Sequence, residues 1–181
     1  MVNIESRYLI GNKVFLRPMQ ESDAPHIVSW RNDSAIKRWM FNQQEITIEG
    51  HLEWFRKPKS NRFDYIIGDI LNNQPIGTVN FINVEENKAE TGKMIGNKNY
   101  WGGGFAKEAF IMWLNIGFKV FNFDLIEAKT MIENVNNIGL NQKIGFKKQK
   151  YEKVKISSDK IADVLIMTIS KSDFYEKNNI V

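Results

Sequence analysis

Cysteine is absent from this sequence of 181 residues, and histidine occurs only as His26 and His51. The lack of cysteine excludes a disulfide scaffold, a thiol nucleophile, an iron–sulfur cluster and every cysteine-based zinc site, and two histidines argue against a histidine metal centre. The sequence also lacks an apolar run long enough to span a membrane, and no basic segment leads into an apolar one at its start, so we expect a cytoplasmic protein without membrane contacts. Its chemistry must therefore use carboxylates, hydroxyls, amides, lysines or a bound cofactor.

A strong charge of either sign is lacking as well. The 25 basic and 21 acidic residues are largely interspersed and leave a net charge of +4, which does not predict a nucleic-acid partner. The one dense basic run, between Lys147 and Lys155, is interpreted as a solvated strand face. Because hydrophobic residues make up 43% of the chain, we expect it to fold, and its length suits one domain.

The hydrophobic pattern predicts one strand followed by three helices, and then mainly strands. Gly77 indicates a bulge, and the last ten residues are expected to fray. The chain has no repeats or linkers, so we expect a single α+β domain over residues 1–181 with a mixed, mostly antiparallel sheet. The expected strands are 13–18, 63–70, 75–84, 89–96, 124–132, 146–155 and 161–170, and the expected helices are 22–32, 34–40, 47–57, 105–119 and 136–144.

The strongest local signal is WGGGFA at residues 101–106, between a predicted strand and a strongly apolar predicted helix. A helix N-terminus exposes unpaired N–H groups and the positive end of a dipole, and glycines let a phosphate approach the backbone. The pattern is neither a dinucleotide fingerprint nor a P-loop. It predicts an anion cradle, with a flexible turn before a core helix as the alternative.

This segment resembles the acetyl-CoA pyrophosphate loop of the GCN5-related N-acetyltransferases (GNAT), whose pattern is Gln/Arg-x-x-Gly-x-Gly/Ala. Trp101 departs from the Gln/Arg position, and Gly104 and Ala106 match. The resemblance implies that backbone amides of the loop hold the pyrophosphate and that the preceding strand faces the pantetheine and thioester. The cofactor-binding residues that it implies are Ile95, Gly96, Trp101, Gly102, Gly103, Gly104, Phe105, Ala106, Asn134 and Asn141.

A second segment, ENVNNIGLNQKIGF at residues 133–146, is similar to the family stretch Asn-x-x-Ser/Ala-Ile-x-x-Tyr-x-Lys-x-Gly-Phe. Asn134 and Lys143 match, whereas Asn137 replaces the small residue and Asn141 replaces the tyrosine that protonates the leaving CoA thiolate in many members. An asparagine amide donates a hydrogen bond but supplies no proton near neutral pH. Water, another side chain or no dedicated acid must therefore take this role.

The whole order of predicted elements also matches the GNAT family, over about residues 10–175. This resemblance implies a sheet of about six to seven strands flanked by helices, and an acetyl-CoA-dependent N-acetyltransferase that transfers acetyl directly to a primary amine. Residues at both ends resemble the RimJ/RimL-like branch, which includes ribosomal-protein N-terminal and spermidine acetyltransferases. No metal is implied, and a homodimer is compatible with the pattern.

The segment from Trp30 to Phe55 is similar to the amino-sugar N-acetyltransferases of pseudaminic-acid synthesis. The resemblance implies a nucleotide-linked amino sugar as acceptor, because an arginine can pair with a diphosphate and an indole can stack on a base or sugar. The alternative for each residue is an ordinary core or capping role. Alternative functions are a protein N-terminal acetyltransferase, a polyamine acetyltransferase and a non-catalytic acyl-CoA-binding module. The implied acceptor-binding residues are Trp30, Arg31, Asn32, Trp39 and His51.

Acetyl transfer needs a neutral acceptor nitrogen, since a protonated amine cannot attack, and a general base can remove its proton. Glu90 in KAETGKMIG matches the glutamate near the start of this strand in the polyamine and ribosomal relatives. We therefore expect Glu90 to be the catalytic base, with substrate binding or a structural role as the alternative. Glu85 and Glu86 in the preceding loop are the second candidates for the base.

Overall fold

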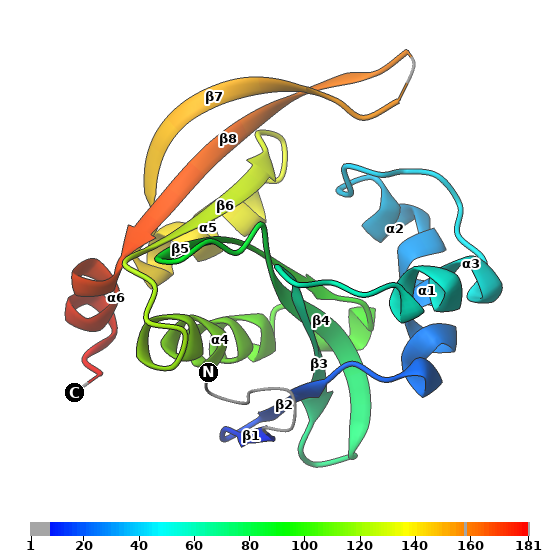
Figure 1. Cartoon of the computed structure of the whole chain (residues 1–181), viewed down its shortest axis with the longest axis horizontal. Helices are drawn as coiled ribbons and strands as arrows, with labels where there is room; N and C mark the ends of the chain where they lie inside the picture. The colour runs from blue at the N-terminus through cyan, green and yellow to red at the C-terminus, as the bar shows by residue number, and fades with distance from the viewer. Residues whose placement is uncertain (1–7, 158, 181) are drawn as a thin grey trace.

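The computed structural model describes residues 8–157 and 159–180, which form one eight-stranded sheet with helices on both faces (Figure 1). The strands are β1 (Leu9–Ile10), β2 (Val14–Pro18), β3 (Phe63–Asp69), β4 (Gln74–Ile82), β5 (Lys88–Ile95), β6 (Leu125–Met131), β7 (Lys147–Lys155) and β8 (Ile161–Ser170). Their order is β1-β2-β3-β4-β5-β6-β8-β7, and only β5 and β6 are parallel neighbours. This confirms the mixed, mostly antiparallel sheet, with the short β1 as a strand beyond those expected.

Five helices begin within two residues of the predicted positions, and a sixth, near the C-terminal end of the described chain, was not predicted. They are α1 (Ala24–Asn32), α2 (Ser34–Lys37), α3 (Ile48–Arg56), α4 (Phe105–Lys119), α5 (Val135–Ile144) and α6 (Lys171–Asn178), with 3₁₀ turns at Glu21–Asp23 and Lys98–Tyr100. Asp33 and Thr47 cap α2 and α3 by accepting from backbone amides. The expectation of a frayed end is wrong for α6, because Ser170 caps it and Phe174 is fully buried. No helix in the described part of the chain is long and apolar enough to cross a membrane.

Alternating side chains of the strands divide between two faces of the sheet. Tyr65 of β3 joins a large core that α4, α5 and α6 cover, and within it Trp113 of α4 stacks on Phe81 of β4 with 4.4 Å between ring centroids. We call this side the α4 face. Ile66 points to the other side, the α1 face, where it packs with α1 and α2.

The α1 face carries two separate apolar clusters. One joins Ile66 and Met94 to the helices, and the other joins Met131 of β6 to β8 and to Trp39 and Phe41, which follow α2. The α1-face residues at the middle of β5 and β6 lie between these clusters. This arrangement leaves polar side chains, including Glu90, at the centre of the α1 face.

The sheet opens between β5 and β6. These strands are paired only as far as Thr91 and Ala128. Beyond that point β5 continues beside β4 to Ile95, and β6 continues beside β8 to Met131. The C-terminal ends of β5 and β6 therefore separate, next to the loop that leads into α4.

The irregularity expected at Gly77 is confirmed. The register of β3 against β4 shifts between Ile67 and Gly68, opposite Gly77. A Cβ atom at Gly77 would also collide with the carbonyl oxygen of Met94. This glycine therefore lets β4 and β5 approach closely where β5 leaves β6.

Candidate active site

The glycine loop before α4 has the geometry of an anion site. Gly102 and Gly104 have φ values of +78° and +84°, in the left-handed region that favours glycine. In the part of the chain that the structure describes, the backbone amides of residues 102–107 donate to no protein acceptor. These free amides begin a helix of 15 residues, whose dipole adds positive potential. The structure thus places Gly102, Gly103, Gly104, Phe105 and Ala106 at the beginning of this helix, and their binding of a pyrophosphate stays a prediction.

A lysine that the sequence analysis missed lies against this loop. Lys13 Nζ donates to the carbonyl of Gly103 at 3.0 Å and sits 5.6 Å from the ring centroid of Phe105. Its backbone is held by Glu108 Oε1, which accepts from the amides of Asn12, Lys13 and Val14 at 2.6, 2.8 and 3.3 Å. Glu108 therefore fixes the turn before β2 against α4 and places a cation beside the free amides. Local sequence gives no signal of a contact that spans 90 residues.

Trp101 closes the loop back onto the end of β5. Its Nε1 donates to the carbonyl of Ile95 at 2.9 Å, while 49% of the residue surface is exposed. The amide of Gly96 donates to the carbonyl of Ile76 at 2.8 Å, so this N–H does not face a pantetheine as expected. The exposed indole of Trp101 remains a contact surface for a ligand on the loop.

Three of the four asparagines of the second motif make contacts that position α5 against the sheet. Asn134 caps α5 by accepting from the amide of Asn137 at 3.3 Å, and Asn137 Nδ2 donates to Thr130 Oγ1 of β6 at 3.1 Å. Asn141 is fully buried, and its Oδ1 accepts from Lys93 Nζ at 2.6 Å. The position where the resemblance implies a tyrosine therefore holds an amide bonded to a lysine of β5.

Lys93 lies on the α4 face of β5, where the sheet is open. Its Nζ is 3.9 Å from the ring centroid of Phe110 on α4, and burial lowers the pKa of this amine to about 7. The sequence analysis missed it, although Lys93 continues the inward alternation of Ala89 and Thr91. A lysine at a strand position that alternation predicts to point inward was the signal in the sequence that could have identified it.

Glu90 lies on the α1 face and is paired. Its Oε2 accepts from Lys129 Nζ at 2.8 Å and from Asn83 Nδ2 at 3.2 Å, and its side chain is 15% exposed. Burial alone would lower the pKa of Lys129, but the hydrogen bond to Glu90 and the opposite charge of Glu90 outweigh this effect and raise the pKa. Glu90 also lines a groove of about 480 Å³ together with Glu85, Lys88 and other residues at the beginnings of β5 and β6.

Two predicted acceptor residues carry buried nitrogen atoms without partners. Arg31 Nη2 donates to the carbonyl of Asn42 at 3.2 Å, but among the described residues neither Arg31 Nε nor Nε2 of His51 on α3 has a hydrogen-bond partner. Burial lowers the pKa of Arg31, and the charge of Arg62 lowers it further. Burial and then the charge of Arg31 also lower the pKa of His51, so this ring is neutral at pH 7. Buried polar groups usually have hydrogen-bond partners, so these two nitrogen atoms are candidate contacts for a ligand.

The other three predicted acceptor residues have structural contacts. Trp30 is buried and packs so closely on Gly96 that a Cβ atom there would collide with its ring. Asn32 exchanges two hydrogen bonds with the backbone of Ile46, and Trp39 packs against the β6–β8 cluster.

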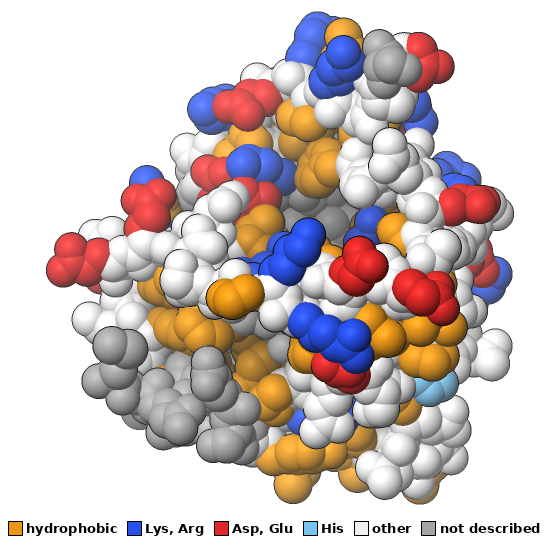
Figure 2. All heavy atoms as spheres, turned by 45° about the vertical axis from the view of Figure 1, so that its right-hand side comes forward, with side chains coloured by type: hydrophobic (Ala, Val, Ile, Leu, Met, Phe, Trp, Pro, Cys, Tyr) orange, Lys and Arg blue, Asp and Glu red, His pale blue; other side chains and the backbone are white. Residues whose placement is uncertain are grey.

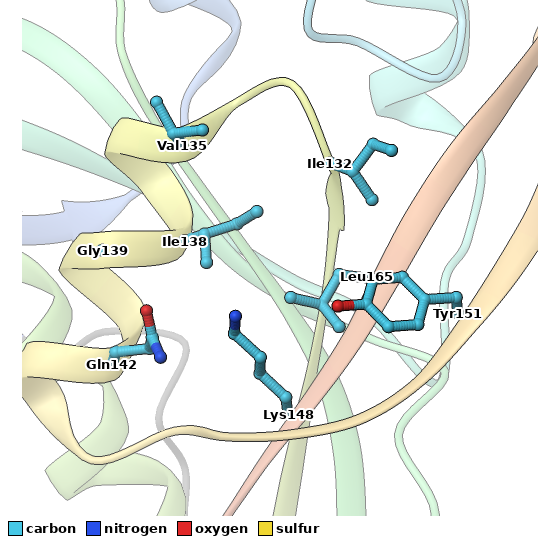
Figure 3. Close-up of a pocket in the computed structure, with 8 residues that line it drawn as sticks. All are labelled: Ile132, Val135, Ile138, Gly139, Gln142, Lys148, Tyr151 and Leu165. Carbon is cyan, nitrogen blue, oxygen red and sulfur yellow. The ribbon is translucent and has the colours of Figure 1, made fainter.

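The face that carries α1, α2 and α3 shows basic and acidic side chains interspersed, without one dominant patch (Figure 2). A separate pocket of about 310 Å³ lies behind α5, under β7 (Figure 3). Ile138 and Gln142 of α5 face this pocket together with Lys148 and Tyr151. Asn141 is not among its lining residues and bonds to Lys93 instead. The pocket is therefore distinct from the candidate site. Among the described residues, no group of His, Asp or Glu side chains is arranged to hold a metal ion.

Comparison with known families gives a match to the acetyltransferase (GNAT) domain over residues 13–147. The chain is 29% identical over 179 residues to the uncharacterized N-acetyltransferase p20 of Bacillus licheniformis, covering 92% of this chain and 97% of that protein. It is 30% identical over 159 residues to the uncharacterized protein MJ1062 of Methanocaldococcus jannaschii, covering 83% of this chain. It spans only 32% of that longer protein.

Solved structures show the same fold. The spermidine N-acetyltransferase of Vibrio cholerae, in complex with CoA and spermine, superimposes with a TM-score of 0.83 at 21% identity, over 91% of this chain and 99% of that one. A GNAT-family acetyltransferase of Bacillus anthracis gives a TM-score of 0.81 at 21% identity, over 92% and 99% of the two chains. Both structures thus share the fold of this chain over nearly their whole length.

Proposed function

The chain belongs to the GNAT acetyltransferase family and is an N-acetyltransferase that uses acetyl-CoA, and we propose that its acceptor is an anionic amine, namely a nucleotide-linked amino sugar. In this proposal acetyl-CoA binds with its pyrophosphate on the amides of residues 102–106 and beside Lys13. The acceptor binds on the α1 face, between the two apolar clusters. The amine then meets the thioester where β5 and β6 separate.

The observation that carries the acceptor proposal is the pair of unpartnered nitrogen atoms, Arg31 Nε and His51 Nε2. A buried guanidinium with a free N–H is matched by an anionic oxygen, such as that of a diphosphate. The neutral ring of His51 can donate to or accept from a sugar hydroxyl, depending on its tautomer. An acceptor with both groups would satisfy both nitrogen atoms.

The charges around this site also favour an anion over a polyamine. The carboxylates of Asp23 and Asp64 are engaged by Arg17 and Arg62, and Glu90 is engaged by Lys129. A spermidine-like substrate needs acids that are free to receive its cations, and these acids are already neutralised. The spermidine acetyltransferase of Vibrio cholerae shares the fold at 21% identity, which does not extend its substrate to this chain.

The proposed reaction is a direct transfer in a ternary complex. The neutral amine attacks the thioester carbonyl carbon, a C–N bond forms, and the C–S bond breaks with its electron pair on sulfur. We assign removal of the amine proton to Glu90, directly or through water, with Lys129 and Asn83 orienting its carboxylate. A cysteine acetyl-enzyme is excluded because the chain has no cysteine.

The decisive experiment is turnover of acetyl-CoA against a panel of amines. The panel should hold a UDP-linked 4-amino sugar, spermidine and a ribosomal N-terminal peptide, each at matched concentration. Release of CoA can be followed with a thiol reagent without background from the protein, which has no thiol. The proposal predicts the highest kcat/KM for the sugar nucleotide, and a preference for spermidine or the peptide would overturn it while leaving the acetyltransferase activity intact.

A further inference from the structure

Lys93 has surroundings that are unusual for a lysine. Its ammonium bonds to the buried amide of Asn141 at 2.6 Å and lies over the ring of Phe110 at 3.9 Å. Among the ion pairs of the described residues, none includes Lys93. The two contacts of this amine, with Asn141 and Phe110, are both with neutral groups, which can hold either the ammonium or the free amine.

The place of Lys93 in the fold is equally specific. Pairing of β5 with β6 ends at Thr91, and Lys93 is two residues further along β5. The same strand then leads through Ile95 and Trp101 into the free amides before α4. A donor whose pyrophosphate rests on those amides can extend its pantetheine along the end of β5 toward the place where β5 and β6 separate, two residues from Lys93.

We propose that Lys93 is the proton donor to the departing CoA thiolate, and that Asn141 is the positioning residue that aims its ammonium into the opening. The proposal rests on the acetyl-CoA site proposed above, but not on the identity of the acceptor. It answers the chemical gap left by Asn141, whose amide cannot supply a proton. The amide instead holds a side chain that can.

The proton balance of this step is complete. As the C–S bond breaks, the electron pair on sulfur takes one proton from the Lys93 ammonium, which gives the free thiol of CoA and a neutral amine. The proton lost by the acceptor nitrogen passes to Glu90 or to water. Lys93 regains a proton from solvent before the next cycle, so an acceptor that arrives as an ammonium releases one proton overall.

Burial supports this role because it brings the pKa of Lys93 to about 7. Such an amine gives and regains a proton near neutral pH, which a surface lysine does less readily. Groups that face it from the packed elements are the amide of Asn141 on α5 and the ring of Phe110 on α4. Neither group titrates, so the pH dependence of this donor belongs to Lys93.

The first test is Lys93→Met, with Lys119→Met at the exposed end of α4 as the control. Turnover is measured with whichever amine of the panel reacts fastest, so a wrong acceptor assignment does not affect the result. We expect kcat to fall by about 10²-fold, within the usual range for a general acid, while acetyl-CoA affinity changes less than threefold. An unchanged kcat, or a loss confined to acetyl-CoA affinity, would overturn the proposal.

The pH profile separates proton donation from a structural role. The donor must be protonated, so wild-type kcat should fall as pH rises through the pKa of Lys93, and Lys93→Met should lose this alkaline limb. In Lys93→Ala/Asn141→Tyr, a phenol replaces the amine as donor, and the limb should reappear near the tyrosine pKa of about 10. If Lys93→Met keeps the wild-type profile, Lys93 is not the acid. Gly104→Asp tests the acetyl-CoA site separately by its binding affinity.

Discussion

Glu108 and Lys13, 95 residues apart in the sequence, are joined by a hydrogen bond of 2.8 Å from the Lys13 amide to the Glu108 carboxylate. This bond and its two neighbours fix the turn before β2 on the first turn of α4. The Lys13 ammonium is thereby held beside the amides that are free to bind a pyrophosphate. The proposed anion site therefore combines two segments that lie 90 to 95 residues apart in the sequence.

Lys13→Met should weaken acetyl-CoA binding by about five- to tenfold, because a half-exposed cation beside a phosphate contributes on the order of 1 kcal/mol. Calorimetric titration of acetyl-CoA into the folded variant measures this loss, which should shrink at high salt as screening increases. Lys119→Met is the control, because Lys119 lies at the end of α4 that is far from the loop. Equal affinities for wild type and Lys13→Met at low salt would contradict this assignment.

Gly104→Asp should lower CoA affinity by at least tenfold, or about 1.4 kcal/mol, because it places a carboxylate where the phosphate must sit. Gly104→Asn is the matched control, since asparagine tolerates a positive φ and fills the same space without a charge. The aspartate variant should bind CoA more weakly than the asparagine variant at equal thermal stability. If both variants bind CoA as the wild type does, the pyrophosphate lies elsewhere.

Glu90→Gln should lower kcat by about 10²–10⁴-fold if Glu90 takes the amine proton. The loss should be smaller at high pH, where the free amine forms without a base. Glu127→Gln is the control, because Glu127 faces Glu90 in the register of β5 and β6 and also contacts Lys129, at 3.5 Å. An effect on KM alone would reassign Glu90 to acceptor binding.

Most of the fold could be predicted from the sequence, because its signals are local. Asp33 and Thr47 cap helices where expected, and the alternation in β3 and β5 gives the two faces of the sheet. The C-terminal helix was missed because its eight residues are mostly polar and only Phe174 is buried. Its stability comes from packing against the rest of the domain, which a local pattern does not reveal.

The site could be predicted only where one segment carries it. The loop at residues 102–106 was found because glycines and a helix start are adjacent in the sequence. Lys13 was missed, since its position depends on Glu108 in a distant helix. Trp30 appears in the sequence as a candidate for stacking on a ligand, but in the fold Gly96 leaves space for its ring and buries it.

The acceptor proposal makes the most specific prediction. Arg31→Ala should weaken a UDP-linked amino sugar by about 1.5–3 kcal/mol, the scale of a hydrogen bond to a charged group, because it removes the buried N–H offered to the diphosphate. Acetyl-CoA binding should not change, because the pyrophosphate loop lies on a different element. Arg56→Ala is the control, since Arg56 is an exposed cation of α3 paired with Glu21.

The measurement is the Kd of the sugar nucleotide in the presence of CoA, compared with the Kd of the corresponding amino sugar without its nucleotide. If Arg31 binds the diphosphate, Arg31→Ala weakens only the first ligand. If it weakens both equally, Arg31 acts on the sugar or supports the wall formed by Asn32 and Ile46. An acceptor without phosphate that binds more tightly to Arg31→Ala than to the wild type would show that the cation repels its substrate, and the anionic acceptor would then be wrong.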